Sequence, residues 1–151
     1  MICIYDRTLA DVAYVYDNQG SDLELKGALN VSDLNRIESN TLWLHQQLES
    51  YDYHSGITVT KTNWVNTDFV YLVDIDRIRQ NIIDIVACYN TFSTTPVLTT
   101  GGQPLTYLHI NDIEKVLFDL DVLLDLMIQK FVYCGTFTCG DTFFFPQQLG
   151  S

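Results

Sequence analysis

The sequence predicts a mainly α protein with a three-helix core, built from one helix motif that occurs three times. The three copies are SDLNRIESN, VDIDRIRQN and NDIEKVLFD, at residues 32–40, 73–81 and 111–119. When the copies are aligned on Asp33, Asp74 and Asp112, apolar residues recur at alternating steps of three and four. That spacing is typical of a helix face that packs against other helices.

Length and charge place further limits on the fold and its partners. The chain has 151 residues, which indicates one domain over residues 1–151, and 47% of them are hydrophobic, as in a globular protein. The formal net charge is −11, with only eight Lys and Arg residues, so neither nucleic acid nor an anionic membrane surface is an expected partner. We also expect no membrane-spanning segment, because the most apolar stretch, VLFDLDVLLDLMI, contains three aspartates.

The repeat predicts helices near residues 32–49, 73–90 and 110–131. Each helix should present one apolar seam, which packs against the other helices or against a second copy of the chain. Burial of each seam side chain contributes about 1.5–3 kcal/mol, so the seams should hold the fold together. The predicted seam residues are Leu34, Ile37, Leu44, Leu48, Ile75, Ile78, Ile82, Ile85, Ile113, Val116, Leu120, Leu123 and Met127.

The beginnings of the three copies are also similar. Ser32 and Asn111 are good N-cap residues, and Asp74 is the expected cap of the second copy, where Val73 precedes it. A basic residue follows each shared aspartate by three positions: Arg36, Arg77 and Lys115. Such pairs add only about 0.2–0.5 kcal/mol on an exposed helix, so we expect them to contribute little.

The connections and the ends favour short β elements. Alternating β-branched residues predict a strand in ITVTKTNW, residues 57–64, and further short strands at residues 2–6 and 13–17. Residues 91–104 are rich in Thr, Gly and Pro and are predicted to be non-helical. The stretch FVYCGTFTCGDTFFF begins at Phe131 and has a strand–turn–strand pattern, so residues 132–146 are predicted to form a β-type tail.

The sequence offers little for catalysis, so we predict a non-enzymatic protein with no cofactor and no metal. His45, His54 and His109 lack the spacing of known ligand or catalytic motifs, although a Ser–His–Asp group that meets only in space stays open. Cys3, Cys88, Cys134 and Cys139 lack zinc-site spacing and are expected as reduced thiols. Asp119, Asp121 and Asp125 are expected on a solvated helix face; an acid–base hydrolase would need them beside a cleft.

Aromatic residues are the candidates for partner contacts. Three consecutive phenylalanines near the end of the sequence would need covering by the domain core or a neighbouring subunit, which favours a homo-oligomer. Exposed aromatic rings could instead stack on sugars, so a receptor- or carbohydrate-binding module is the alternative. The candidate contact residues are Trp64, Tyr51, Tyr53, Phe143, Phe144 and Phe145.

Several segments, in this order, resemble a module of phage and prophage tail proteins of Gram-positive bacteria. They are YDRTLADV, LKGALNVSDLNRIESN, KTNWVNTDFVYLVDIDRIRQNI, INDIEKVLFDLDVLLDLMI and FVYCGTFTCG. The resemblance implies a structural virion protein of the tail tip, baseplate or fibre attachment, made in the cytoplasm of the bacterial host. It implies contacts with other tail proteins and self-assembly, as a trimer if tail-tip symmetry applies, and it carries no catalytic residues.

Overall fold

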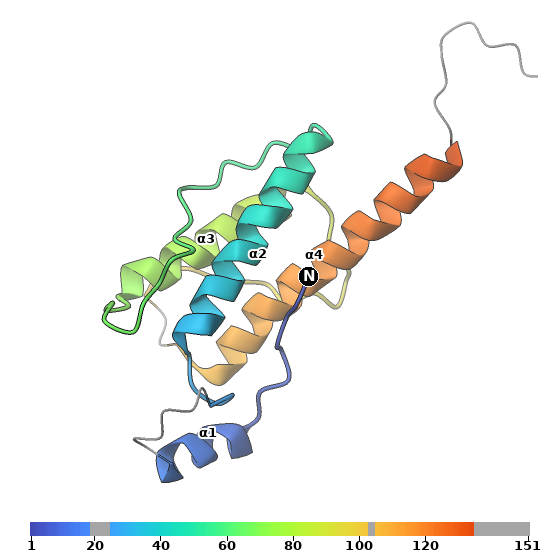
Figure 1. Ribbon diagram of the computed structural model, residues 1–151. Helices are drawn as coiled ribbons and strands as arrows, with labels where there is room; N and C mark the ends of the chain where they lie inside the picture. Colours follow the sequence, from blue (N-terminus) through green and yellow to red (C-terminus); the bar gives the residue numbers. More distant parts are fainter. Residues whose placement is uncertain (19–24, 103–104, 135–151) are drawn as a thin grey trace, which may run out of the picture.

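The structure, a computed structural model, describes residues 1–18, 25–102 and 105–134, and within these it contains four helices and no strand (Figure 1). The mainly α prediction is therefore confirmed. The helices are α1 (Leu9–Asp17), α2 (Val31–Ser50), α3 (Leu72–Cys88) and α4 (Tyr107–Cys134).

Helices α2, α3 and α4 pack pairwise into a bundle around one apolar core. Of the predicted seam, all residues from Leu34 to Leu120 are buried, while Leu123 and Met127 are half-buried. The periodicity therefore identified the inward faces of all three helices. Further core residues that the periodicity did not identify are Trp64, Ile110, Leu117 and Leu124.

The helices begin earlier than the sequence predicted. Asn30, not Ser32, is the N-cap of α2, and Tyr71, not Asp74, is the N-cap of α3. The repeated aspartate instead lies three residues after the cap and reaches back: the Asn30 backbone N–H donates to Asp33 Oδ2 at 3.0 Å. The Tyr71 N–H donates to Asp74 Oδ2 at the same distance, so both aspartates supply the carboxylate half of a capping box.

Asn111 was also predicted as a cap, but α4 already begins at Tyr107, after Thr106. The Asn111 side chain instead bonds to the backbone of Arg7 through both its oxygen, at 3.1 Å, and its nitrogen, at 2.8 Å.

The predicted strands are wrong for the described residues. Residues 13–17 belong to α1, and residues 132–134 belong to α4. Residues 2–6 and 57–64 are non-helical segments without a partner strand. Helix side chains bond to the backbone of these segments instead. The remainder of the predicted β-type tail, residues 135–146, lies outside the described residues.

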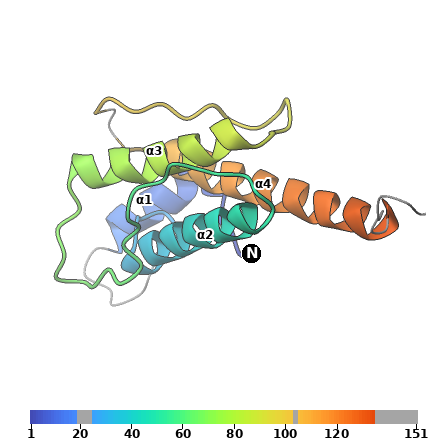
Figure 2. The same cartoon turned by 90° about the horizontal axis from the view of Figure 1, so that it is seen from above.

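Three non-helical segments each lie across two helices, and we call them the first strap (residues 2–7), the second strap (residues 58–64) and the third strap (residues 95–102). The first strap bonds to α2 and α4, the second to α3 and α2, and the third to α4 and α3. Figure 2 shows the second and third straps as thin tubes beside α2 and α3.

Helix α1 lies at one end of the bundle and buries none of its residues (Figure 1). Its N-cap is Thr8, which forms a capping box with Asp11 and thereby lowers the pKa of the Asp11 carboxyl group. Gly27 lies against the backbone of α1, and a Cβ atom at Gly27 would be only 2.2 Å from the Asp11 carbonyl oxygen. The absence of a side chain at residue 27 therefore allows this close approach.

We expect Gly27→Ala to displace α1 and to lower the free energy of unfolding by about 1–3 kcal/mol, because the added methyl group meets backbone that cannot rotate away. Hydrogen exchange should accelerate in residues 9–17 and remain slow in α2 to α4. Gly56→Ala is the matched control, since a Cβ atom at Gly56 meets nothing within 4 Å. Unchanged exchange in α1 of Gly27→Ala would contradict the packing described here.

Helix α4 has 28 residues, which corresponds to about 42 Å, and its C-terminal end extends past the other helices (Figure 1). Among the described residues, no helix has the length and apolar character needed to cross a membrane.

Candidate functional site

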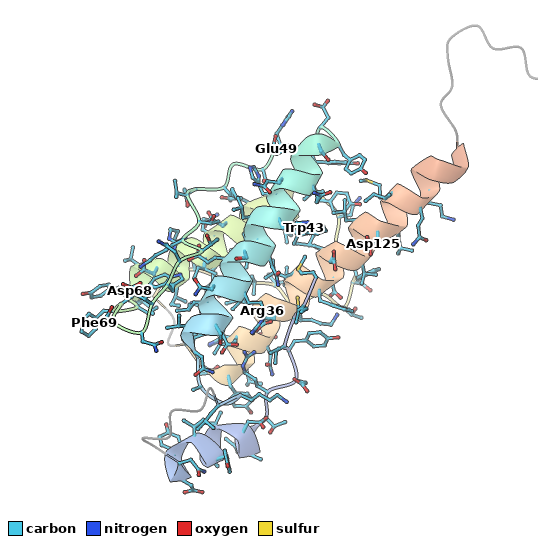
Figure 3. All side chains as sticks on the ribbon, in the orientation of Figure 1. Arg36, Trp43, Glu49, Asp68, Phe69 and Asp125 are labelled. Atoms are coloured by element: carbon cyan, nitrogen blue, oxygen red, sulfur yellow. The ribbon has the colours of Figure 1, made fainter. Side chains whose placement is uncertain are left out.

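Five consecutive large apolar residues, Phe69 to Val73, are exposed to solvent. Their exposed fractions range from 41% for Val70 to 79% for Phe69. These residues form the end of the loop before α3 and the beginning of the first turn of α3. Figure 3 shows Phe69 at the outer edge of the molecule. Contiguous exposed apolar surface of this kind marks interaction sites more often than isolated apolar residues do. We call residues 69–73 the apolar run.

The loop that carries the apolar run is held by charged and aromatic side chains. Asp68 accepts hydrogen bonds from the Lys61 ammonium group at 2.7 Å and from the Val65 backbone N–H at 3.1 Å. These two bonds, the one from Lys61 first, lower the pKa of the Asp68 carboxyl group. The same ammonium group lies 3.9 Å from the centre of the Trp64 ring, a cation–π contact. The apolar run therefore follows a loop with a defined shape.

Beneath this loop, a buried carboxylate joins α2, α3 and the second strap. Glu38 is 1% exposed, and both of its oxygens accept from the Arg77 guanidinium group at 2.7 Å. It also accepts from the Trp64 indole N–H at 3.0 Å and from the Lys61 backbone N–H at 2.7 Å. The hydrogen bonds that Arg77 donates to Glu38 outweigh burial and raise the pKa of Arg77. Burial of the Glu38 carboxylate is tolerated because the group is paired with Arg77 and fully hydrogen-bonded.

A second buried cluster joins the first strap to α2 and α4. Glu114 is fully buried and accepts from Arg36 at 2.6 Å, from Arg7 at 3.1 Å and from the Ile4 backbone N–H at 2.5 Å. Asp33 accepts from both arginines as well, at 2.9 Å from Arg7 and 2.5 Å from Arg36. Burial lowers the pKa of Arg36, but the hydrogen bonds to Glu114 and Asp33 outweigh it and leave this pKa raised. Two acids and two bases thus neutralise one another inside the protein.

Polar residues at matched positions of the three motif copies anchor the three straps. Seven residues after the shared aspartate, Asn40 binds the Ile2 carbonyl, Asn81 binds Thr58, and Asp119 binds Thr95. A second set lies two residues after the shared aspartate: Asn35 binds the Trp64 backbone, Asp76 binds the Gly102 N–H, and Glu114 binds the Ile4 N–H. Each strap therefore bonds to one anchor of each set, on two different helices.

The predicted acid–base pairs within the motif form in only one copy. Arg36 does pair with Asp33, but within the buried cluster, so the expectation of a small surface effect is wrong there. Arg77 pairs with Glu38 on the neighbouring helix, and Lys115 pairs with Asp119 one turn further along α4. The partner of Arg77 therefore comes from another helix, while Lys115 bonds to a different acid of its own helix than the motif predicts.

His45 and His54 both lie near Glu49, without the geometry of a catalytic triad, and His109 lies apart from them. His45 Nδ1 lies 2.6 Å from Ser55 Oγ and 3.8 Å from Glu49 Oε1, so serine and acid meet the same ring nitrogen. A triad needs the two ring nitrogens for these two roles. Glu49 also bonds to His54 at 2.7 Å, which raises the pKa of the exposed His54 ring and lowers that of Glu49. His109 bonds to Thr106 at the start of α4.

The acidic residues of α4 do not share one solvated face. Asp119 is buried and bonds to Lys115 and to the Thr95 hydroxyl, so its prediction as a solvated residue is wrong, whereas Asp125 is exposed. The described residues contain no group of three or more His, Cys, Asp or Glu side chains placed to hold a metal ion. In that same part of the chain Cys3 and Cys88 are free thiols, and burial, followed by Glu114 and Asp121, raises the pKa of Cys3 to about 11.

The predicted partner contacts are only partly at the surface. Trp64 is 4% exposed and bonded to Glu38, so its prediction as an exposed anchor or sugar-stacking residue is wrong. Tyr53 is half-buried with its ring 5.0 Å from that of Tyr89, while Tyr51 is exposed. Phe143, Phe144 and Phe145 lie outside the described residues.

Sequence reasoning missed the apolar run, although a signal was present. Five successive apolar residues cannot all point to one side of the chain, in a loop or in a helix, so one buried face cannot accommodate them all. The matched polar positions of the three copies were a second signal. Asn40, Asn81 and Asp119 occupy the same position of the motif, seven residues after the shared aspartate. Apolar periodicity uses only the fact that this position is not apolar, so it does not reveal the shared polar character.

No protein-family model matches this chain, and neither a curated protein nor a solved structure is similar to it.

Proposed function

We propose that this protein is a non-enzymatic structural component of a phage or prophage tail, at the tip, baseplate or fibre attachment, which acts through contacts with copies of itself and with other tail proteins. The main support for the assembly role is the apolar run, because its five side chains are exposed to solvent when the chain is alone. The tail assignment itself is supported by the sequence resemblance. A virion location follows from the same assignment.

The buried ionic clusters support a role that requires a fixed shape. Glu38 and Glu114 each bond to more than one structural element, so the straps and helices hold one relative position. Polar networks that are fully hydrogen-bonded rigidify and specify one arrangement of a core. A surface held in this way can meet a neighbouring subunit with little ordering cost on assembly.

The same proposal includes the architecture: α2, α3 and α4, each with its strap, are three copies of one strap–helix unit. Its support is that the anchors at matched positions pair with the straps in cyclic order. The helix of each copy holds its own strap seven residues after the aspartate and the next strap two residues after it. Helix α1 is then an insertion in the first unit. The predicted β-hairpin in residues 135–146 stays a prediction.

Self-association is the first test. We expect analytical ultracentrifugation to give a molecular mass that is a multiple of the 17.3 kDa chain mass. Tail-tip symmetry would make the oligomer a trimer. The double variant Phe69→Gln/Val73→Gln should shift it to the monomer, because polar side chains remove apolar area that the contact buries. Leu9→Gln is the matched control, since Leu9 is 69% exposed but lies on α1, and it should leave the oligomer unchanged. A wild-type chain that stays monomeric at high concentration would overturn self-assembly through this run.

The tail assignment needs its own test. Mass spectrometry of purified particles from an induced lysogen carrying this gene should detect the chain among the virion proteins, and its absence would reject a virion role. The alternative, a receptor- or carbohydrate-binding module, must now rely on Tyr51 and the threonine-rich segments, because Trp64 is buried. Glycan binding that Tyr51→Ala abolishes and the double variant retains would favour that alternative.

A further inference from the structure

A small apolar pocket lies between α3, α4 and the first residues of the third strap, with Thr91 before it. Its volume is about 130 Å³. Val116, fully buried on α4, forms its floor, and Val97, 90% exposed, stands at its mouth. The lining residues are Ile83, Val86, Thr91, Thr95, Pro96, Val97, Leu98 and Val116.

The lining determines what the pocket can hold. Six of its eight residues are apolar, and the remaining two are threonines, so no charged side chain lines it. The Thr95 hydroxyl donates to Asp119 at 2.7 Å and is therefore already paired. A charged ligand would lose its hydration here without gaining a partner, whereas an apolar ligand loses only unfavourable contact with water.

The volume limits the size of the ligand. Pockets for drug-sized molecules and cofactors occupy roughly 300–1,000 Å³, so this one is too small for them. An engineered apolar cavity of about 150 Å³ in another protein stays dry and binds benzene. A single ring is therefore the largest flat group that the present pocket can enclose.

The third strap closes one side of the pocket and is bound at both ends. Thr95 bonds to Asp119 on α4, and the Gly102 N–H bonds to Asp76 on α3 at 3.0 Å. Asp119 is in turn paired with Lys115. These anchors hold the apolar wall made by Val97 and Leu98 in place without contributing charge to the lining.

We propose that this pocket is a binding site for one small, uncharged aromatic ring of about the size of toluene. It is independent of the apolar run, and the binding site does not depend on the proposed tail function.

Methyl NMR of the full-length protein, titrated with toluene, tests the proposal. The methyl signals of Val86 and Val116 should shift in a saturable way, while those of Leu34 should not. Benzoate at equal concentration should cause no shift, because it adds a charge to the same ring. Shifts spread evenly over the protein, absence of shifts at toluene saturation, or equal effects of benzoate would each overturn the site.

A filling variant provides the second arm. Val86→Phe places a ring in the pocket and should weaken toluene binding by roughly tenfold or more, because the space is occupied. Ile83→Val removes one methylene and is the matched control, which should retain binding. If Val86→Phe does not fold, intermolecular NOEs from toluene to Val116 in the wild-type protein decide the question. NOEs only to residues outside the pocket lining would reject the proposal.

Discussion

Glu38→Ala is expected to lower the free energy of unfolding by about 3–5 kcal/mol, the cost of removing one partner of a buried ion pair. The substitution leaves the Arg77 guanidinium group, the Trp64 indole N–H and the Lys61 backbone N–H without their shared acceptor. Urea denaturation followed by circular dichroism gives the change. A loss of this size would exceed any expected from a surface charge, which is about 0–1 kcal/mol.

Two comparisons make the measurement specific. Gln46→Ala, at an exposed position of the same helix, should stay within about 0.5 kcal/mol of the wild type. Arg77→Ala combined with Glu38→Ala should cost less than the sum of the two single variants, because each removes the same pair. Strict additivity, or a loss below 1 kcal/mol in Glu38→Ala, would mean that the cluster does not hold the second strap.

Glu114→Gln should have an effect of similar size, about 3–5 kcal/mol, and should also release the first strap. The variant keeps the side-chain shape but leaves the Arg7 and Arg36 guanidinium groups with Asp33 as their shared acid. Arg7 is 3% exposed in the folded protein, so trypsin should cleave after it slowly in the wild type and quickly in the variant.

The order of cleavage separates local release from global unfolding. In Glu114→Gln, cleavage after Arg7 should precede cleavage after Arg77 and Arg79, which lie within α3. Asp125→Asn is the matched control, since it changes the charge equally on an exposed position of the same helix. Simultaneous cleavage at all three arginines would show that the first strap does not open separately from the bundle.

The sequence predicted the helix faces well because periodicity reports directly on which side is buried. Leu44, Ile82 and Leu120 are completely buried, as their spacing predicted. The helix starts were less predictable, because a repeated aspartate fits the N-cap, the position after it and the third position of a capping box. Only the bond from the Asn30 N–H to Asp33 distinguishes these two positions.

The candidate site was not predictable from the same pattern. The alternation in residues 57–64 resembles a strand, but its backbone bonds go to the side chains of Asn81, Glu38 and Asn35. Local periodicity contains no information about such distant partners. For the same reason, Trp64 could be taken for an exposed anchor, while the indole N–H in fact needed a buried acceptor.

The first strap also affects how the protein is made. Arg7 and Glu114 are separated by 107 residues, so this contact forms only when both ends of the domain are available. During translation, Arg7 and Arg36 leave the ribosome long before Glu114, the buried acceptor that they share, and until then only Asp33 can accept from both. Before α4 has been synthesised, the cluster therefore has an excess positive charge next to a solvent-exposed apolar seam. The arginine side chains and the seam can be buried only once Glu114 is present.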